Sequence, residues 1–115
     1  MKYLFLTLLF TPLFFSCKKE KSHFDSLKNS SWTTYYQYNG FNFYASSNLR
    51  LSSDFSCSDI GLVDTIVGSW QYQEEKLNIT LENSTIIVAS FISNDSLSGT
   101  IKNGVTSGVW SAKRD

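Results

Sequence analysis

Few residues of the chain belong to the types that carry out chemistry. The single histidine, His23, has no cysteine and no paired carboxylate beside it. A nucleophilic triad needs a base next to its nucleophile. This histidine lies before residue 31, where the alternating β-pattern begins, so we do not expect it to act as that base. Asp54, Asp59 and Asp64 recur at a spacing that differs from that of an EF-hand loop, in a stretch where charges serve solubility. We therefore expect no enzyme, no metal site and no cofactor.

The two cysteines lie in different settings. Cys17 follows an apolar run and a small residue, Ser16, and a charged run comes directly after it at 18–21. The segment 1–16 has the layout of a secretory signal peptide and falls short of the roughly 20 apolar residues of a membrane-spanning helix. Cys57 stands between two serines, and we expect it to behave as a small, half-buried residue.

The sequence Phe14-Phe15-Ser16-Cys17 resembles the lipobox of bacterial lipoproteins. The resemblance implies cleavage after Ser16 and acylation of Cys17, which anchors the protein stably to a membrane. Lys18, rather than an aspartate, follows the cysteine, and this resembles the residue found there in many lipoproteins that are sorted to the outer membrane. The resemblance implies an outer-membrane lipoprotein that faces the periplasm or the cell surface. The run 18–21 is similar to a surface-export signal and fits a solvated spacer equally well. We expect a signal peptide at 1–16, a lipidated tether at 17–25 and one domain at 26–115.

Composition narrows the class of partner. The chain has 115 residues, with 10 basic and 10 acidic side chains. This balance argues against nucleic acid, which requires a basic stripe on the protein. Aromatic residues make up 16% of the chain, which is typical of a small β-rich core.

Alternation of apolar and polar residues predicts β-structure from residue 31 onward. Asn-Gly pairs at 39–40 and 103–104 predict two-residue hairpin turns, and a third hairpin bends at 74–75, where two glutamates favour a longer loop. These turns place Trp70 opposite Ile79, Tyr72 opposite Leu77, Tyr36 opposite Phe43, Trp32 opposite Ser47, Leu97 opposite Trp110, and Gly99 opposite Gly108.

We predict strands at 31–38, 41–46, 48–53, 65–73, 76–82, 85–92, 96–102 and 105–113, with a long loop over 54–64 and a helical turn over 24–29 that could plug one end. Because nearly all connections are short, we expect strands that follow one another in the sequence to lie side by side in the sheet. The predicted fold is therefore all-β, a small antiparallel up-and-down barrel of about eight strands, which closes its own edges. A two-sheet sandwich is the alternative.

Three features resemble the small lipocalin-like domains of bacterial lipoproteins: Trp32 on the first strand, Gly68-Ser69-Trp70, and the ending from Gly99 to Arg114. In lipocalins a Gly-x-Trp opens the first strand and a late arginine packs on that tryptophan; here Ser30 takes the place of the glycine. Strand parity puts Trp32 and Arg114 on the same inward face. We predict that Arg114 lies over or beside Trp32.

Two places could bind a partner. One is an interior slot left by the two glycines, which would hold a small apolar ligand between Phe43, Trp70, Tyr72, Gly99, Gly108 and Trp110. The alternative is that a bulky side chain fills this gap or that the glycines mark a bend. The other place is the outward pair Tyr35 and Tyr44, which suits a sugar or a protein partner and could equally be simple cross-strand stabilisation.

We expect a membrane-anchored, non-enzymatic binding protein that holds a small apolar ligand. The alternative is a protein-interaction or envelope-structural module, such as an inhibitor or accessory subunit, that acts through its outer surface.

Overall fold

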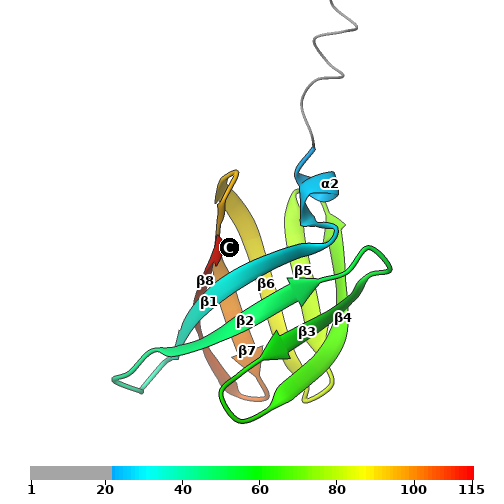
Figure 1. The fold of residues 1–115 in the computed structure, drawn as a ribbon. Helices are drawn as coiled ribbons and strands as arrows, with labels where there is room; N and C mark the ends of the chain where they lie inside the picture. Colours follow the sequence, from blue (N-terminus) through cyan, green and yellow to red (C-terminus); the bar gives the residue numbers. More distant parts are fainter. Residues whose placement is uncertain (1–21) are drawn as a thin grey trace, which may run out of the picture.

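Residues 22–115 are described by a computed structural model. Its elements are α2 His23–Leu27, β1 Ser30–Tyr38, β2 Ala45–Leu51, β3 Ser56–Ile60, β4 Thr65–Gln73, β5 Lys76–Leu81, β6 Thr85–Ser93, β7 Ser96–Asn103 and β8 Thr106–Arg114. Each strand pairs antiparallel with the next, and β8 pairs with β1, which closes the barrel (Figure 1). The predicted eight-stranded all-β barrel is confirmed. The predicted signal peptide and the lipidation site Cys17 lie outside the described residues.

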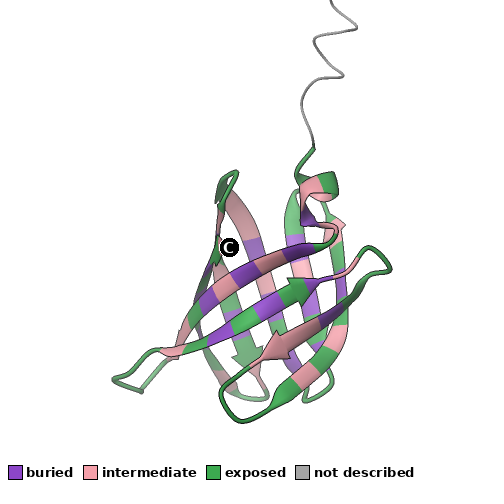
Figure 2. Cartoon of the chain, in the orientation of Figure 1, coloured by how far each residue is buried: buried purple, intermediate pink, exposed green. Residues whose placement is uncertain are grey.

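Side-chain alternation along the strands builds the core. On β8, Gly108, Trp110 and Ala112 are buried, while the residues between them are exposed (Figure 2). The same alternation on the other strands brings the buried apolar side chains into one cluster: Leu27, Trp32, Leu49, Leu51, Cys57, Trp70, Leu77, Ile79, Leu81, Ile87, Ala89, Leu97, Ile101, Trp110 and Ala112. Because opposite residues of paired strands share a face, this cluster runs through the barrel interior.

The β4–β5 hairpin has the predicted register. Trp70 lies opposite Ile79 and Tyr72 opposite Leu77. The connection is a two-residue turn at 74–75, in which the φ angles of the two glutamates are 52° and 64°. Positive φ at both central residues is what a type I′ turn requires. The strand pairing therefore holds two side chains in a left-handed conformation that costs roughly 1–2 kcal/mol per residue.

The predicted pairing of the first hairpin is wrong by two residues. Trp32 pairs with Leu49 rather than with Ser47, and Tyr36 pairs with Ala45. Inward parity is unchanged, because the shift is an even number of residues. The observed register sets two large apolar side chains opposite one another, and both are at most 1% exposed. Burying a leucine in place of a serine favours this register over the predicted one.

The longer connection of this hairpin explains the shift. The chain turns at Gly40, whose φ is 91°, and the Phe41 amide donates to the Tyr38 carbonyl at 3.2 Å. It re-enters the sheet only at Ala45, so the predicted strands 41–46 and 48–53 are a single strand, β2. Phe43, expected to face inward, lies in the connection with 64% of its surface exposed.

The stretch 54–64, predicted as a long loop, contains β3. This strand pairs with β2 on one side and β4 on the other. Its inward positions are Cys57, opposite Leu51, and Asp59, opposite Leu49. One small thiol and one carboxylate give no apolar alternation, so the strand depends on backbone pairing with both neighbours. The total of eight holds because two predicted strands merge and one unpredicted strand appears.

The β7–β8 hairpin is also shifted by two residues. Its two-residue turn is formed by Gly104 and Val105, because Asn103 already pairs with Thr106. Only Gly104 has a positive φ, 63°, as at the first central position of a type II′ turn. Asn103 is therefore the last paired residue of β7, and Gly104 is the first residue of the turn.

Helix α2 covers one end of the barrel (Figure 1). The Ser22 side chain caps it by accepting from the Asp25 amide at 3.1 Å. Leu27 is fully buried, and Phe24 packs against the core cluster at 6.2 Å from the ring of Trp70. The predicted helical turn is thus present, beginning at residue 23 inside the stretch expected to be tether, and it seals this end.

The contact expected at the closing seam is present at the same end. Trp32 and Arg114 are paired residues of β1 and β8, and the guanidinium carbon lies 4.4 Å from the tryptophan ring centroid. Arg114 also donates to the Ser26 carbonyl at 2.9 Å and to the Asn94 carbonyl at 3.0 Å, and it forms an ion pair with Asp95 at 3.3 Å. One side chain therefore ties the helix, the seam and the β6–β7 turn together.

Candidate functional site

The residues predicted to line an interior slot do not form one. Trp70 and Trp110 are 1% and 3% exposed and belong to the continuous core cluster. Tyr72 packs against that cluster at the α2 end, 6.3 Å from the ring of Phe24. Phe43 lies in the β1–β2 connection, at the opposite end. The predicted set is therefore divided between the core and the two ends of the barrel.

The two glycines are not opposite one another. Gly99 pairs with Trp110, and Gly108 pairs with Ile101 on β7 and with Tyr38 on β1. A Cβ at Gly99 would lie 2.0 Å from a carbonyl oxygen of β6, and one at Gly108 would lie 2.1 Å from a carbonyl oxygen of β1. The backbones of the neighbouring strands occupy the space that the missing side chains leave. The glycines therefore let neighbouring strands approach closely, which agrees with the alternative that they mark a bend in the barrel rather than a ligand slot.

The outward tyrosines are exposed but not paired with each other. Tyr35 is 45% exposed and lies opposite Ser46 and Ser111, because of the register shift in the first hairpin. Tyr44 is 69% exposed and stands at the end of the β1–β2 connection. The predicted flat pair of rings is not formed.

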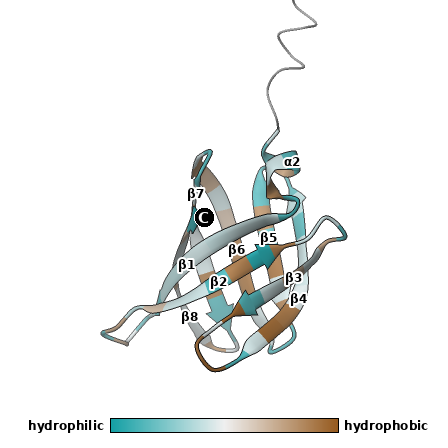
Figure 3. Cartoon of the chain, in the orientation of Figure 1, coloured by the Kyte–Doolittle hydropathy of each residue, from teal (hydrophilic) through white to brown (hydrophobic). Residues whose placement is uncertain are grey.

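The end of the barrel away from α2 carries the most exposed apolar side chains. The β1–β2, β3–β4, β5–β6 and β7–β8 connections all lie there (Figure 1). Leu62 and Val63 at the tip of the β3–β4 connection are 103% and 93% exposed, and Val105 in the β7–β8 turn is 102% exposed. Figure 3 shows the β3–β4 connection as a hydrophobic segment at this end. Exposed apolar tips gathered at one end are typical of a surface that meets a partner.

A cleft of about 770 Å³ opens at this end between the β1–β2 and β3–β4 connections. We call it the loop cleft. It is lined by three aromatic residues, Tyr36, Phe43 and Tyr44, and by two carboxylates, Asp59 and Asp64. The remaining lining residues are small, polar or aliphatic, and none is a lysine, arginine or histidine. Its volume lies within the range of about 300–1,000 Å³ that is usual for ligand pockets.

A smaller crevice of about 70 Å³ adjoins the loop cleft. Its lining consists of Tyr36, Tyr38, Phe41, Phe43 and Ala45, so it is entirely aromatic apart from one alanine. Tyr36 and Phe43 line both spaces. The two tyrosine rings meet edge to face with centroids 5.8 Å apart, as do the two phenylalanine rings. We call this space the aromatic crevice.

Asp59 is held in the loop cleft by a chain of hydroxyl groups from two strands. The Ser47 hydroxyl donates to Asp59 Oδ1 at 2.5 Å. The Thr34 hydroxyl lies 2.6 Å from the Ser47 hydroxyl and 3.2 Å from the Ser47 carbonyl oxygen. Because Ser47 gives its hydrogen to the carboxylate, the single Thr34 hydrogen is shared between these two acceptors. Thr34 is 1% exposed and Ser47 is 9% exposed, so the chain is fixed in the barrel wall.

Electrostatics at this end are set by that carboxylate. Burial raises the pKa of Asp59 above its ordinary value, and the hydrogen bond from Ser47 offsets part of the rise. Burial, followed by the charge of Asp59, also raises the pKa values of Tyr36 and Tyr38. Both phenols therefore stay neutral at physiological pH. The two salt bridges among residues 22–115 are Lys28–Asp25 and Arg114–Asp95, so Asp59 has no cationic partner there.

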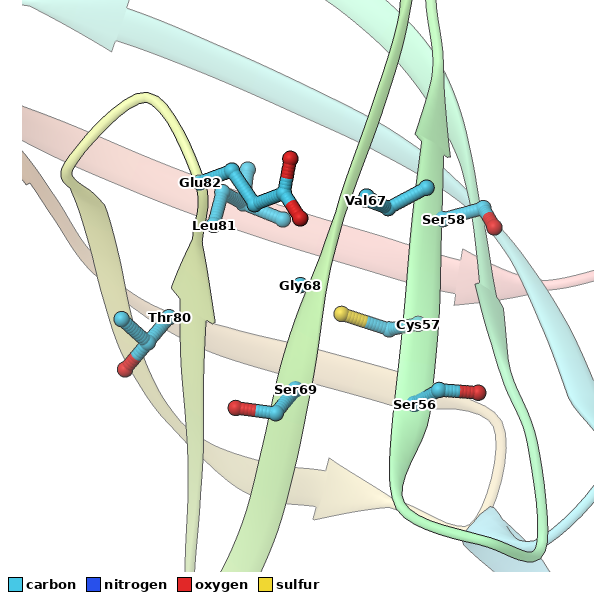
Figure 4. Close-up of a pocket in the computed structure, with 9 residues that line it drawn as sticks. All are labelled: Ser56, Cys57, Ser58, Val67, Gly68, Ser69, Thr80, Leu81 and Glu82. Carbon is cyan, nitrogen blue, oxygen red and sulfur yellow. The ribbon is translucent and has the colours of Figure 1, made fainter.

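A second depression, of about 510 Å³, lies across β3, β4 and β5 (Figure 4). Figure 4 shows the Cys57 side chain directed from β3 towards Gly68 on β4. Burial, followed by the charge of Asp59, raises the pKa of the Cys57 thiol to about 11. The thiol therefore stays protonated near neutral pH and is a poor nucleophile. Cys57 is 2% exposed and belongs to the core cluster, so it is a small structural residue as expected but is buried rather than half-buried.

Two statements hold for residues 22–115. No group of three or more histidine, cysteine or acidic side chains in that range is placed to hold a metal ion. The helix in that range is not long and apolar enough to cross a bilayer.

No model of a known protein family matches the sequence, and no curated protein or solved structure matches it either. What the protein does must therefore be argued from the barrel itself.

The sequence offered a signal for only part of this site. The aromatic residues of the loop cleft were visible, and Phe43 and Tyr44 were singled out, though for different places. Asp59 was assigned to a solvated loop, because its inward position depends on β3, which carries no apolar alternation. The signal that could have found it is the even spacing from Cys57, once a strand is assumed there.

Proposed function

We propose that the protein is a lipid-anchored, non-enzymatic binding module of the bacterial cell envelope that takes up a small, mainly apolar ligand at the open end of its barrel. The observation that carries this proposal is the loop cleft. It has the volume of a ligand pocket, aromatic walls that suit an apolar body, and a few fixed polar groups at one side. The barrel interior beneath it is occupied by the core cluster.

Native mass spectrometry of the protein purified from its own host tests the ligand. We expect a retained small molecule in the wild type, and its loss in Phe43→Ala, which removes a ring shared by the loop cleft and the aromatic crevice. Ile92→Ala is the matched control, because Ile92 is 70% exposed on β6 and lines neither space. A ligand retained equally by both variants would place binding elsewhere and refute the proposal.

The lipid anchor is supported by the lipobox-like sequence at Cys17 and by the position of α2, which places the start of the described chain at one end of the barrel. Intact-mass analysis of the membrane-extracted protein tests it. We expect an acylated N-terminal cysteine, lost in Cys17→Ala and kept in Cys57→Ala, which removes a buried thiol. An unlipidated wild-type protein would refute this part alone.

A second candidate function is docking to a protein partner through the apolar tips. It is favoured by Val105, which is 102% exposed and lies outside the loop cleft. In the native mass spectra this function predicts the mass of a complex, and Val105→Asp should abolish that complex while leaving a small ligand in place. Retention of the complex by Val105→Asp would rule out docking at this tip.

A further inference from the structure

The loop cleft combines an uncompensated carboxylate with aromatic walls, and this combination defines a class of ligand. Asp59 and Asp64 line the cleft together with no basic side chain. A half-buried carboxylate without a protein cation keeps an unfavourable desolvation energy that a positively charged group could relieve. A neutral or anionic ligand would leave that energy unrelieved or increase it.

The Asp59 carboxylate is positioned in a way that leaves one oxygen available. Oδ1 accepts from Ser47, which is itself held by Thr34, so the carboxylate has a fixed orientation. Oδ2 accepts no hydrogen bond from residues 22–115. Every buried side-chain oxygen or nitrogen in that range has a partner, so Oδ2 is not fully buried. It therefore keeps some contact with solvent and has a free lone pair to accept from a ligand. An ammonium group is a strong donor to a carboxylate oxygen, because such bonds are charge-assisted.

The rings beside this carboxylate favour the same chemistry. Tyr36 lines the loop cleft together with Asp59, and it continues with Phe43 into the aromatic crevice. Aromatic faces attract a cation within about 6 Å of the ring centroid, and their edges and faces also cover an apolar body. The arrangement thus provides a place for a charge and an adjoining place for a ring or a short hydrocarbon chain.

We propose that the ligand of the loop cleft is a small organic ammonium ion, with its charged nitrogen at Asp59 and its apolar part against Tyr36 and Phe43. This inference rests on the proposed function, because it names the class of ligand for the same site. It excludes carboxylates, phosphates and fully apolar molecules as preferred ligands.

Three probes of similar size separate charge from shape: 2-phenylethylammonium, neutral 2-phenylethanol and anionic phenylacetate. Each is titrated into the isotope-labelled protein, expressed from its full-length gene, and followed by amide chemical shifts of the residues that line the loop cleft. We expect the ammonium probe to bind about tenfold or more tightly than the alcohol, as a charge-assisted bond in place of a neutral one implies. We expect phenylacetate to produce no shifts there.

Asp59→Asn is the decisive variant, because it removes the charge and keeps an oxygen that can accept from Ser47. It should reduce the affinity for the ammonium probe to that for the alcohol. Asp54→Asn is the matched control: it changes the net charge equally, lies in the β2–β3 connection at the α2 end, and should leave the affinity unchanged.

The outcomes distinguish the two proposals. If the alcohol binds in the cleft as tightly as the ammonium probe, or Asp59→Asn leaves ammonium binding unchanged, the ligand class is wrong and the binding site stands. If no probe shifts the cleft residues, both the ligand class and the proposed function fail.

Discussion

Gly108→Ala probes the seam that closes the barrel. Gly108 on β8 pairs with Tyr38 on β1, and a Cβ there would lie 2.1 Å from the Gln37 carbonyl oxygen and 2.6 Å from the Tyr38 Cα. Both atoms belong to the backbone of β1, and the Tyr38 carbonyl also accepts from the Phe41 amide, so they cannot rotate away as a side chain would. Relief requires β1 and β8 to separate by on the order of 1 Å, which stretches hydrogen bonds of about 2.9 Å beyond their useful range.

The magnitude follows from three terms. Overpacking of a fixed site costs about 1–3 kcal/mol, and two weakened seam hydrogen bonds cost about 1 kcal/mol each. Alanine lowers the entropy of the unfolded chain and returns about 0.4–1 kcal/mol. We expect the free energy of unfolding to fall by about 2–4.5 kcal/mol, and Tm to fall by roughly 10–35 °C for a domain of this size.

Thermal and urea unfolding, followed by tryptophan fluorescence, measure this loss. Gly61→Ala is the matched control, because the nearest atom to its added Cβ is a carbonyl oxygen at 3.4 Å, an ordinary contact. It should stay within about 0.5 kcal/mol of the wild type. If Gly108→Ala were as stable as Gly61→Ala, the seam would be able to widen without cost, and the close-approach argument would be refuted.

Three other variants test separate parts of the barrel. Glu75→Gly relieves a φ of 64° in the β4–β5 turn, so the urea midpoint should rise in line with a gain of about 1 kcal/mol. Arg114→Lys keeps the charge but loses the planar stack on Trp32, and calorimetry should show a loss of about 1–2 kcal/mol that Lys113→Ala, an exposed neighbour, does not share. Asp59→Asn should raise the urea midpoint at pH 7. The folded-state pKa of Asp59 lies above its ordinary value of 3.8, so the wild type loses stability as the pH rises from 3.8 through the folded-state pKa. The difference in urea midpoint between the variant and the wild type should therefore disappear below that pH range.

The sequence predicted the architecture of this barrel better than its details. Turn residues and side-chain parity were enough to predict a closed antiparallel barrel and the Trp32–Arg114 contact, because a shift by two residues preserves every inward face. The number of strands is right only because the merger of two predicted strands into β2 is offset by the unpredicted β3. The predicted registers are wrong where the Asn-Gly pair does not itself form the two-residue turn. Asn103 belongs to β7 rather than to the turn, and Asn39 opens a longer connection, whereas the two glutamates at 74–75 adopt the tight turn that their type disfavours.

The candidate site was harder to predict, because it depends on which residues a connection leaves outside the sheet. Phe43 was placed inside by parity, and it lines the mouth because the chain stays out of the sheet until Ala45. Asp59 belongs to a strand whose inward residues are a thiol and a carboxylate, a pattern that sequence periodicity does not distinguish from a loop. Its neighbours Ser47 and Thr34 come from two other strands and meet it only once the registers are correct.

The two ends of the barrel differ in construction. One end is sealed by Leu27 and cross-linked by Arg114, and the described part of the chain begins there with α2. The segment from Cys17 to Ser22 spans at most about 18 Å when fully extended, so a lipid on Cys17 would hold the sealed end next to the bilayer. The nine-residue strand β1 is roughly 30 Å long, and because barrel strands tilt by about 40°, it separates that end from the loop cleft by about 20–25 Å along the barrel axis. A ligand would then reach the cleft from the aqueous side, which is where a small ammonium ion partitions, whereas a fully apolar molecule would partition into the membrane.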